Sequence, residues 1–326
     1  MAATANDRYG DSSGPEPATT GSYGEAPGGF RLPTETRLGR VRLQVADLER
    51  SLAFYEQTLG LRILRRDSAV AVLAAHGGDA ALVELHQLAG ARPMSRRGRL
   101  GLYHFAILLP DRASLGRLVR HLGEIGVHAG AGDHLVSEAF YLTDPDGLGI
   151  EVYADRPRNS WRRIGRELMM ATDPVDVPGL LRAAGSGAWE GMPAGTVIGH
   201  VHLHVGDTDL ASAFFSEALG FDRMVWSYPG ALFLGAGGYH HHLGANIWAG
   251  SNAEPPGDGD ARLLEWTIEL PDAASVVAVA ENLGRAGMPT EPGPGQGARA
   301  EFVTHDPWGT RIRVLAADAQ RTGLGS

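Results

Sequence analysis

The sequence predicts an α+β fold in which four copies of one βαβββ module form paired, half-open β-barrels with their helices outside. One strand start occurs twice: residues 39–47 read Gly-Arg-Val-Arg-Leu-Gln-Val-Ala-Asp, and residues 199–207 read Gly-His-Val-His-Leu-His-Val-Gly-Asp. A second pair of segments, 104–111 and 265–272, matches in the same way, and both segments end in Leu-Pro-Asp. Repetition of this kind indicates tandem copies of one structural unit.

Each repeated strand start leads into a predicted amphipathic helix with recognisable ends. An aspartate precedes each helix, where its carboxylate can accept a hydrogen bond from the first helical turn. Gly60 and Gly220 follow two of the helices, where a left-handed C-cap belongs. We therefore interpret four aspartates as helix caps and not as catalytic groups: Asp47, Asp111, Asp207 and Asp272.

Tight turns precede the last strands of two modules, with Asp-Pro-Asp-Gly from Asp144 and Asp-Pro-Trp-Gly from Asp306. The four modules then cover about 36–90, 99–157, 196–250 and 261–316. We expect two domains, residues 36–157 and 196–316, joined by a connecting segment over 158–195. Residues 1–35 are predicted to be a disordered tail because Gly, Pro, Ser and Thr dominate its composition and few aliphatic side chains are available for burial. Residues 317–326 form a C-terminal tail.

The composition is that of a soluble globular protein, with 43% hydrophobic and 21% charged residues. A net charge of −9 argues against a nucleic-acid partner. No apolar run approaches the roughly 18 residues of a membrane span, and the N-terminus does not resemble a secretory signal, so a cytoplasmic location is expected. A homo-oligomer is compatible with the sequence. The chain has no cysteine, so a metal would have to be bound by His, Asp or Glu.

The strand at 200–205 alternates three histidines with aliphatic residues. Alternation places His200, His202 and His204 on one face, toward a cavity, and the aliphatic side chains on the face that packs on helices. His104 and Glu151 lie on strands of another copy of the repeated unit. Two imidazoles and one carboxylate on separate strands can bind one metal ion, so a mononuclear metal site is the leading hypothesis. The plain alternative is three polar positions on a half-exposed sheet.

This four-module arrangement resembles the vicinal oxygen chelate superfamily, which includes glyoxalase I, fosfomycin-resistance proteins, bleomycin-binding proteins and extradiol ring-cleaving dioxygenases. Two finer motifs resemble the dioxygenases. Tyr141 lies ten residues before Glu151, and residues 238–246 read Gly-Tyr-His-His-His-Leu-Gly-Ala-Asn. Together with Tyr153-Ala-Asp-Arg-Pro-Arg, these motifs are similar to the bacillary type of catechol 2,3-dioxygenases.

The resemblance implies an enzyme that inserts O2 into catechol or a substituted catechol, with Fe(II), or alternatively Mn(II), as its cofactor. The implied metal ligands are His104, Glu151 and His200. His241 is the implied acid–base residue, although a shift of one residue would give His240, and its ordinary pKa near 6.5 suits proton transfer near neutral pH. Tyr141 is the implied hydrogen-bond donor to the substrate. Further candidates beside the substrate are His134, His240 and Asn246.

The ligand set departs from the pattern of most two-domain extradiol enzymes, whose ligands come from the third and fourth modules. Here the fourth module has Glu265 and Arg313 at the corresponding positions. We therefore expect modules 2 and 3 to share one barrel that contains the metal. Modules 1 and 4 would share the other barrel, where Arg40, Glu265 and Arg313 would form a charged cluster without metal.

Two alternatives belong to other functional classes. A glyoxalase-like enzyme using Ni(II), Zn(II) or Mn(II) usually has a second carboxylate ligand, whereas His242 and Asn246 stand at the matching end of module 3. A metal-free protein that binds an aromatic compound generally lacks the His-His-Glu set. His202 and His204 are expected to face substrate or solvent. Two tryptophans are expected in the core: Trp248 and Trp266.

Overall fold

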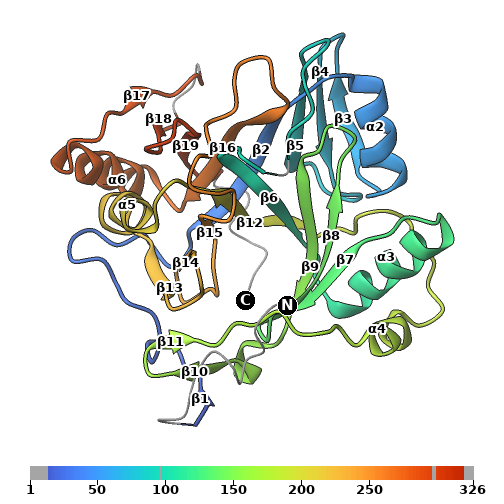
Figure 1. Ribbon diagram of the computed structural model, residues 1–326, viewed down its shortest axis with the longest axis horizontal. Coiled ribbons are helices and arrows are strands. Elements are labelled where there is room, and N and C mark those ends of the chain that lie inside the picture. The colour runs from blue at the N-terminus through green and yellow to red at the C-terminus, as the bar shows by residue number, and fades with distance from the viewer. Residues whose placement is uncertain (1–13, 96, 296–298, 319–326) are drawn as a thin grey trace.

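The computed structural model describes residues 14–95, 97–295 and 299–318, and most of its strands lie in two mixed eight-stranded sheets (Figure 1). We call the first the histidine sheet. In spatial order it contains β13 (Asp222–Val225), β14 (Ala231–Gly235), β15 (Leu243–Asn246), β12 (Val197–His204), β6 (Gly101–Leu108), β9 (Gly149–Asp155), β8 (Ser137–Thr143) and β7 (Gly130–Asp133).

We call the second the arginine sheet, because arginines lie along its central strands. In spatial order it contains β17 (Glu291–Pro292), β18 (Glu301–His305), β19 (Arg311–Ala316), β16 (Arg262–Leu270), β2 (Arg37–Val45), β5 (Ala81–Gln87), β4 (Val70–Ala74) and β3 (Arg62–Arg66). A small third sheet contains β1 (Glu16–Pro17), β10 (Arg162–Ile164) and β11 (Glu167–Leu168).

The modules pair across the two halves of the chain, as predicted. In the histidine sheet β12 runs antiparallel to β6, with Val201 opposite Phe105 and His202 opposite His104. In the arginine sheet β16 pairs with β2 in the same antiparallel sense. Modules 2 and 3 therefore share one sheet and modules 1 and 4 share the other, which confirms the predicted fold class.

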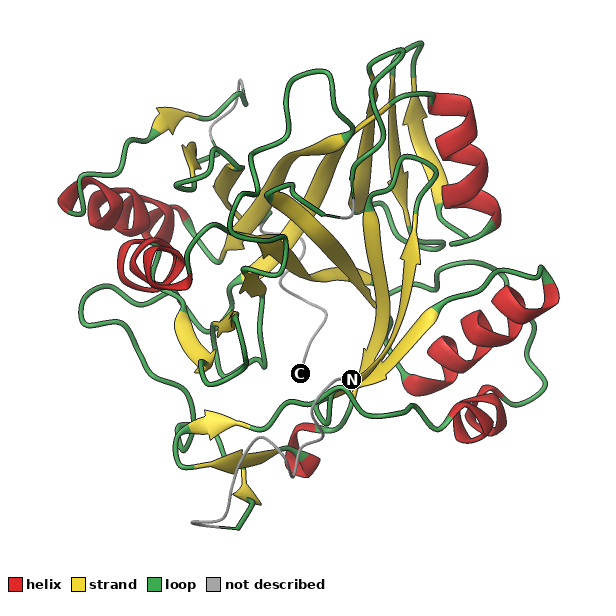
Figure 2. Ribbon diagram, in the orientation of Figure 1, coloured by secondary structure: helices red, strands yellow, loops and turns green. Residues whose placement is uncertain are grey.

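The helices lie on the outside of the sheets (Figure 2). They are α2 (Leu48–Gln57), α3 (Arg112–Glu124), α4 (Val177–Ala184), α5 (Thr208–Ser212), which continues as a π-helix over Ala213–Ala218, and α6 (Ala273–Arg285); a 3-10 turn, η1, covers Arg158–Ser160. The side chains of the four predicted N-caps each accept a hydrogen bond from a backbone N–H in the first turn, which confirms their structural role: Asp47, Asp111, Asp207 and Asp272. No helix among the described residues is long and apolar enough to cross a membrane.

The aliphatic face of β12 packs in the main hydrophobic core, as its alternation predicts. Val201 and Leu203 are completely buried in the same cluster as Phe214 and Phe215 from the π-helix. Burial of side chains of this size stabilises the fold by about 1.5–3 kcal/mol each. The opposite face of β12 is thereby fixed toward the interior of the curved sheet.

The prediction of a disordered N-terminal tail is wrong for residues 14–35. Tyr23 is buried, and its hydroxyl donates a hydrogen bond of 2.7 Å to the carbonyl of Gly238. Arg31 forms a 2.6 Å ion pair with the buried Asp222, and Leu32 is buried in the main core. This segment is ordered although its average composition is polar, because Tyr23, Arg31 and Leu32 each make a specific long-range contact. Residues 1–13, and residues 319–326 of the predicted C-terminal tail, lie outside the described residues.

The predicted turn before β9 is built around a buried carboxylate. Asp144 accepts hydrogen bonds from the backbone N–H groups of Asp146 at 2.9 Å and Leu148 at 2.8 Å. Burial raises the pKa of the Asp144 carboxyl to about 7, against the opposing effect of these two hydrogen bonds. The folded protein therefore holds a proton on Asp144 at pH values where an unfolded carboxyl with an ordinary pKa of 3.8 has lost it.

We predict that Asp144→Asn flattens the pH dependence of stability between about pH 4 and pH 7. In the unmodified protein the folded state binds more protons than the unfolded state over this range, so this carboxyl makes stability fall as pH rises. The effect is at most about 4 kcal/mol, because it spans roughly three pKa units. Urea unfolding at several pH values measures it. The exposed Asp79→Asn is the control, and an unchanged slope in Asp144→Asn would contradict the prediction.

Candidate metal centre and active site

Three neighbouring central strands of the histidine sheet bring the predicted metal ligands together. His104 lies on β6, Glu151 on β9 and His200 on β12, and all three side chains are buried. In the strand register, Ala106 of β6 lies opposite both Glu151 and His200. Since Ala106 lies on the same face of β6 as His104, its small side chain leaves space between the carboxylate and the imidazole.

The ligand atoms are spaced as the edges of a metal coordination polyhedron. The Oε2 atom of Glu151 lies 3.0 Å from Nε2 of His104 and 3.3 Å from Nε2 of His200, and the two Nε2 atoms are 3.4 Å apart. With ligand bonds of about 2.1 Å, neighbouring ligands stand about 3.0 Å apart in an octahedron and about 3.4 Å apart in a tetrahedron. The three residues fit a single metal ion, and they are the one such group of three or more ligating side chains among the described residues.

The protonation of Glu151 and His200 also suits a metal ion. Burial alone would raise the pKa of Glu151, but the hydrogen bonds and charges of His200 and His104 hold that pKa well below the ordinary value. Burial lowers the pKa of His200 to about 4, so its imidazole is neutral at pH 7. A carboxylate and neutral imidazoles are the forms in which these side chains coordinate metals.

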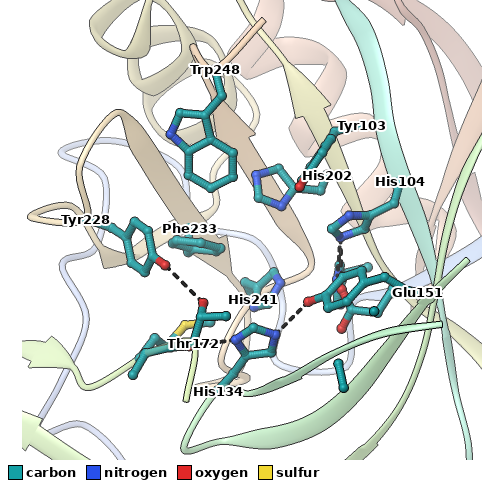
Figure 3. A pocket seen from close by; sticks show the side chains of 16 residues that line it. Tyr103, His104, His134, Glu151, Thr172, His202, Tyr228, Phe233, His241 and Trp248 are labelled. Carbon is teal, nitrogen blue, oxygen red and sulfur yellow. Dashed lines mark hydrogen bonds and ion pairs between the residues drawn. The ribbon is translucent and has the colours of Figure 1, made fainter. Parts of the chain in front are cut away.

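The triad opens on a cavity of about 290 Å³ (Figure 3). Tyr141 and His241, the two residues predicted to be catalytic, line this cavity together with His134 and His202. His240 and Asn246 are buried behind its wall and are outside the set of lining residues. The cavity therefore collects residues from modules 2 and 3 around the proposed metal position.

Tyr141 and His134 form a hydrogen-bonded pair at one side of the cavity. The Tyr141 hydroxyl lies 2.6 Å from Nε2 of His134, and Nδ1 of His134 lies 2.6 Å from the carbonyl oxygen of Ala171. Because a carbonyl oxygen only accepts, Nδ1 carries the proton, and a neutral imidazole then accepts the Tyr141 O–H at Nε2. Burial raises the pKa of Tyr141 well above its ordinary value, and the Glu151 charge adds to this effect, so the phenol keeps its proton.

His241 is hydrogen-bonded to His240, which is in turn hydrogen-bonded to Asp155. Nε2 of His240 lies 2.9 Å from the Asp155 carboxylate, and Nδ1 of His240 lies 2.7 Å from Nδ1 of His241. His240 donates to Asp155 through Nε2, so its Nδ1 accepts the Nδ1–H of a neutral His241. The remaining nitrogen of His241, Nε2, then has a free lone pair. Burial lowers the pKa of His241 well below its ordinary value, and the neighbouring His200 acts in the same direction.

Asn246 orients two further histidines. Its side-chain nitrogen lies 2.9 Å from Nε2 of His202, and its side-chain oxygen lies 2.7 Å from Nδ1 of His204. His202 lines the cavity, whereas His204 is buried outside the lining set. Asn246 therefore holds the ring of His202 in place without lining the cavity itself.

One wall of the cavity was not predicted from the sequence. Trp266 is fully buried, as predicted, but Trp248 is 43% exposed and lines the cavity, so its assignment to the core was wrong. The physical reason is its position just beyond β15, where the strand has ended and its alternation no longer applies. The connecting segment also lines the cavity through residues 170–172, which no repeat or spacing marks in a single sequence. Two more aromatic residues complete this wall: Tyr228 and Phe233.

The charged cluster predicted for the other sheet has different members. Glu265 pairs with Arg311 at 2.8 Å and with Arg42 at 3.6 Å. Arg40 instead pairs with Glu84 at 3.1 Å, and Arg313 pairs with Glu301. The prediction was wrong because it considered only β2, β16 and β19, whereas the neighbouring strands β5 and β18 supply carboxylates of their own.

We predict that Glu151→Ala abolishes tight metal binding, because the variant loses the single charged ligand and keeps two neutral imidazoles. The metal content of Fe(II)-loaded, desalted protein, measured by plasma emission spectroscopy, should fall from about one ion per chain to less than about 0.1. His86→Gln, which changes a histidine of the arginine sheet, is the control and should retain the metal. Full occupancy in Glu151→Ala would show that these three residues are not the ligand set.

Comparisons with known proteins agree with this arrangement. The model of the Glyoxalase/Bleomycin resistance protein/Dioxygenase superfamily matches residues 37–152 and 197–314. Over 261 residues the chain is 46% identical to the catechol-2,3-dioxygenase of Bacillus subtilis strain 168, and the match covers 79% of this chain and 90% of that protein. The chain is thus a homologue of a catechol 2,3-dioxygenase.

Solved structures at low identity share the fold. A provisionally assigned dioxygenase from Bacillus subtilis matches with a TM-score of 0.60 at 12% identity, over 88% of this chain and 86% of that one. A variant of glyoxalase I from Zea mays matches with a TM-score of 0.51 at 20% identity, over 86% and 92%. With both halves of the chain matched by the family model, the predicted pairing of strands and a buried metal-binding triad, the chain belongs to the glyoxalase/bleomycin resistance protein/dioxygenase superfamily.

Proposed function

We propose that this protein is an Fe(II)-dependent extradiol dioxygenase that opens the ring of catechol or a substituted catechol with O2. The observation that carries the proposal is the buried His104–Glu151–His200 triad, which opens on a cavity in a homologue of a catechol 2,3-dioxygenase. Two imidazoles and one carboxylate are the ligand set of non-haem Fe(II) oxygenases, which supports Fe(II) over Mn(II). When bound, iron would supply Lewis acidity and an electronic connection between the diol and dioxygen.

His241 is proposed as the group that moves the substrate proton. Its Nδ1 is hydrogen-bonded to His240. Nε2 is therefore the atom whose lone pair can take a proton from a diol hydroxyl. Its depressed pKa keeps it neutral and ready to accept that proton at pH 7. The Asp155 carboxylate, acting through His240, would stabilise the charge that develops on the imidazole. The geometry favours His241 over His240 for this role, because His240 lies behind the cavity wall.

Tyr141 is proposed to hold a substrate oxygen in place. Its hydroxyl stays protonated, and His134 fixes its direction from the opposite side. His134 is itself held by the carbonyl of Ala171 in the connecting segment. The two residues thus present a preorganised polar group on the cavity wall that needs little rearrangement when the substrate binds.

We predict catechol-dependent oxygen consumption by protein that has been loaded with Fe(II) under anaerobic conditions. An oxygen electrode and the absorbance of the yellow ring-opened product measure the reaction together. Glu151→Ala should lose both signals, because the metal is lost, and His241→Asn should lower kcat by about 100-fold or more, because it lacks the base. Bound iron without oxygen uptake on catechol or alkylcatechols would direct attention to a non-oxidative metalloenzyme or a binding protein.

A further prediction concerns the hydrogen bonds that connect His241 through His240 to Asp155. Asp155→Asn should lower kcat by about 10-fold with KM changed by less than about 2-fold, because an uncharged acceptor stabilises the imidazolium less well. Steady-state kinetics over a range of catechol concentrations separate the two constants. Asp222→Asn, which removes another ion-paired carboxylate of the histidine sheet, controls for general destabilisation. An unchanged kcat in Asp155→Asn would exclude a role for the carboxylate in proton transfer.

A further inference from the structure

One wall of the cavity is an arc of aromatic side chains. Phe233 lies 5.0 Å from the His241 ring and 5.5 Å from the Tyr228 ring, measured between centroids. Trp248 lies 6.1 Å from Tyr228 and 5.8 Å from Tyr103. We call these four residues the aromatic arc: Tyr103, Tyr228, Phe233 and Trp248. Figure 3 shows Tyr228, Phe233 and Trp248 across the cavity from Glu151.

The arc presents mainly carbon to the cavity. The Tyr228 hydroxyl is 3.2 Å from Oγ1 of Thr172, so its polar end is bound at the connecting segment and its ring remains to line the wall. Met170 adds a thioether to the same lining. Trp248 and Tyr103 line the cavity and are also 43% and 39% exposed, which places them at its opening. Partly exposed aromatic side chains at a cavity mouth favour an apolar ligand.

The charged residues of the cavity also favour an uncharged ligand. The sequence has no lysine, and no arginine is among the described residues that line the cavity. Glu151, a proposed metal ligand, is the one acidic side chain among the described residues that line the cavity. An anionic substituent on a bound catechol would be desolvated beside aromatic carbon with no cation to pair with it.

We propose that the substrates of this enzyme are catechols that bear an uncharged, apolar ring substituent, either alkyl or aryl. This inference rests on the proposed function, because the diol must face the triad for the rest of the ring to reach the arc. The substituent then lies against Phe233 and Trp248 on the far wall. Trp248, at the opening, determines which substituents are accepted, whereas the buried Phe233 limits how far they extend beside His241.

Two probes of similar size and opposite character test the inference: 4-isobutylcatechol and 3,4-dihydroxyphenylacetate. Unsubstituted catechol is the reference. With Fe(II)-loaded protein we expect kcat/KM for the isobutyl compound to exceed that for the carboxylate compound by about 100-fold, because the carboxylate has no partner in the cavity. Anaerobic titration followed by tryptophan fluorescence should rank the dissociation constants in the same order without turnover.

Variants of the arc assign the preference to its residues. Trp248→Ala should lower the kcat/KM ratio of 4-isobutylcatechol to catechol by about 10-fold. Trp248→Arg should raise the ratio of 3,4-dihydroxyphenylacetate to catechol by about 10-fold, because it adds the missing cation. Ile247→Ala changes an exposed neighbour outside the lining and should leave both ratios within about 2-fold.

The outcomes separate the two proposals. If catechol is consumed but 3,4-dihydroxyphenylacetate is used as well as the isobutyl compound or better, the substrate class is wrong and the proposed function stands. If all three catechols fail to consume oxygen while iron is bound, both proposals are overturned. Unchanged ratios in both Trp248 variants would show that the arc does not determine the choice of substituent.

Discussion

The antiparallel pairing of β12 with β6 is the interaction on which the rest of the structure depends. It joins a strand of the second half of the chain to a strand of the first half and places His200 beside His104 and Glu151. Strand pairing of this kind has a strict register, because a shift of one residue would turn every side chain of β12 to the other face. The completely buried Val201 and Leu203 oppose such a shift, so the hydrophobic core on one face maintains the metal centre on the other.

The arginine sheet shows what the same backbone arrangement does with different side chains. Arg40 and Arg42 occupy the positions in β2 that correspond to His200 and His202 in β12. Their guanidinium groups pair with carboxylates of the same sheet, including Glu84 and Glu265. The scaffold therefore supports either a set of charge pairs or a metal centre, and the choice lies in a few side chains on the inner face of the central strands.

Much of the fold was predictable because its signals are local and repeated. Caps such as Asp47 and Asp207 follow from the chemistry of a helix start. The pairing of modules 2 and 3 follows because these two modules carry the predicted metal ligands. The register and the neighbouring strands could not be predicted in this way. Arg40 meets Glu84 because β5 lies beside β2, a contact between parallel strands that no spacing rule connects.

The candidate site shows the same difference between residues that local motifs indicate and contacts that depend on the folded arrangement of strands. The resemblance to the extradiol enzymes indicated the triad, Tyr141 and the stretch containing His241, but it did not indicate Asp155 as the group behind His240. That link joins residues 85 positions apart and is visible only once β9 and the loop before β15 lie together. The N-terminal segment illustrates the limit of composition as a guide, because Tyr23 and Leu32 are minority residues in a polar stretch and yet they fix its path.

Because one site is assembled from both halves of the chain, the site depends on both halves staying together. Neither half alone contains the triad, since the first contributes His104 and Glu151 and the second contributes His200. Limited proteolysis in the part of the connecting segment that follows residue 172, which does not line the cavity, would leave a nicked but complete site, whereas removal of either half would destroy it. The same geometry allows two chains to exchange halves and form two identical sites in a swapped dimer, because β12 requires only a β6 edge and not one from its own chain.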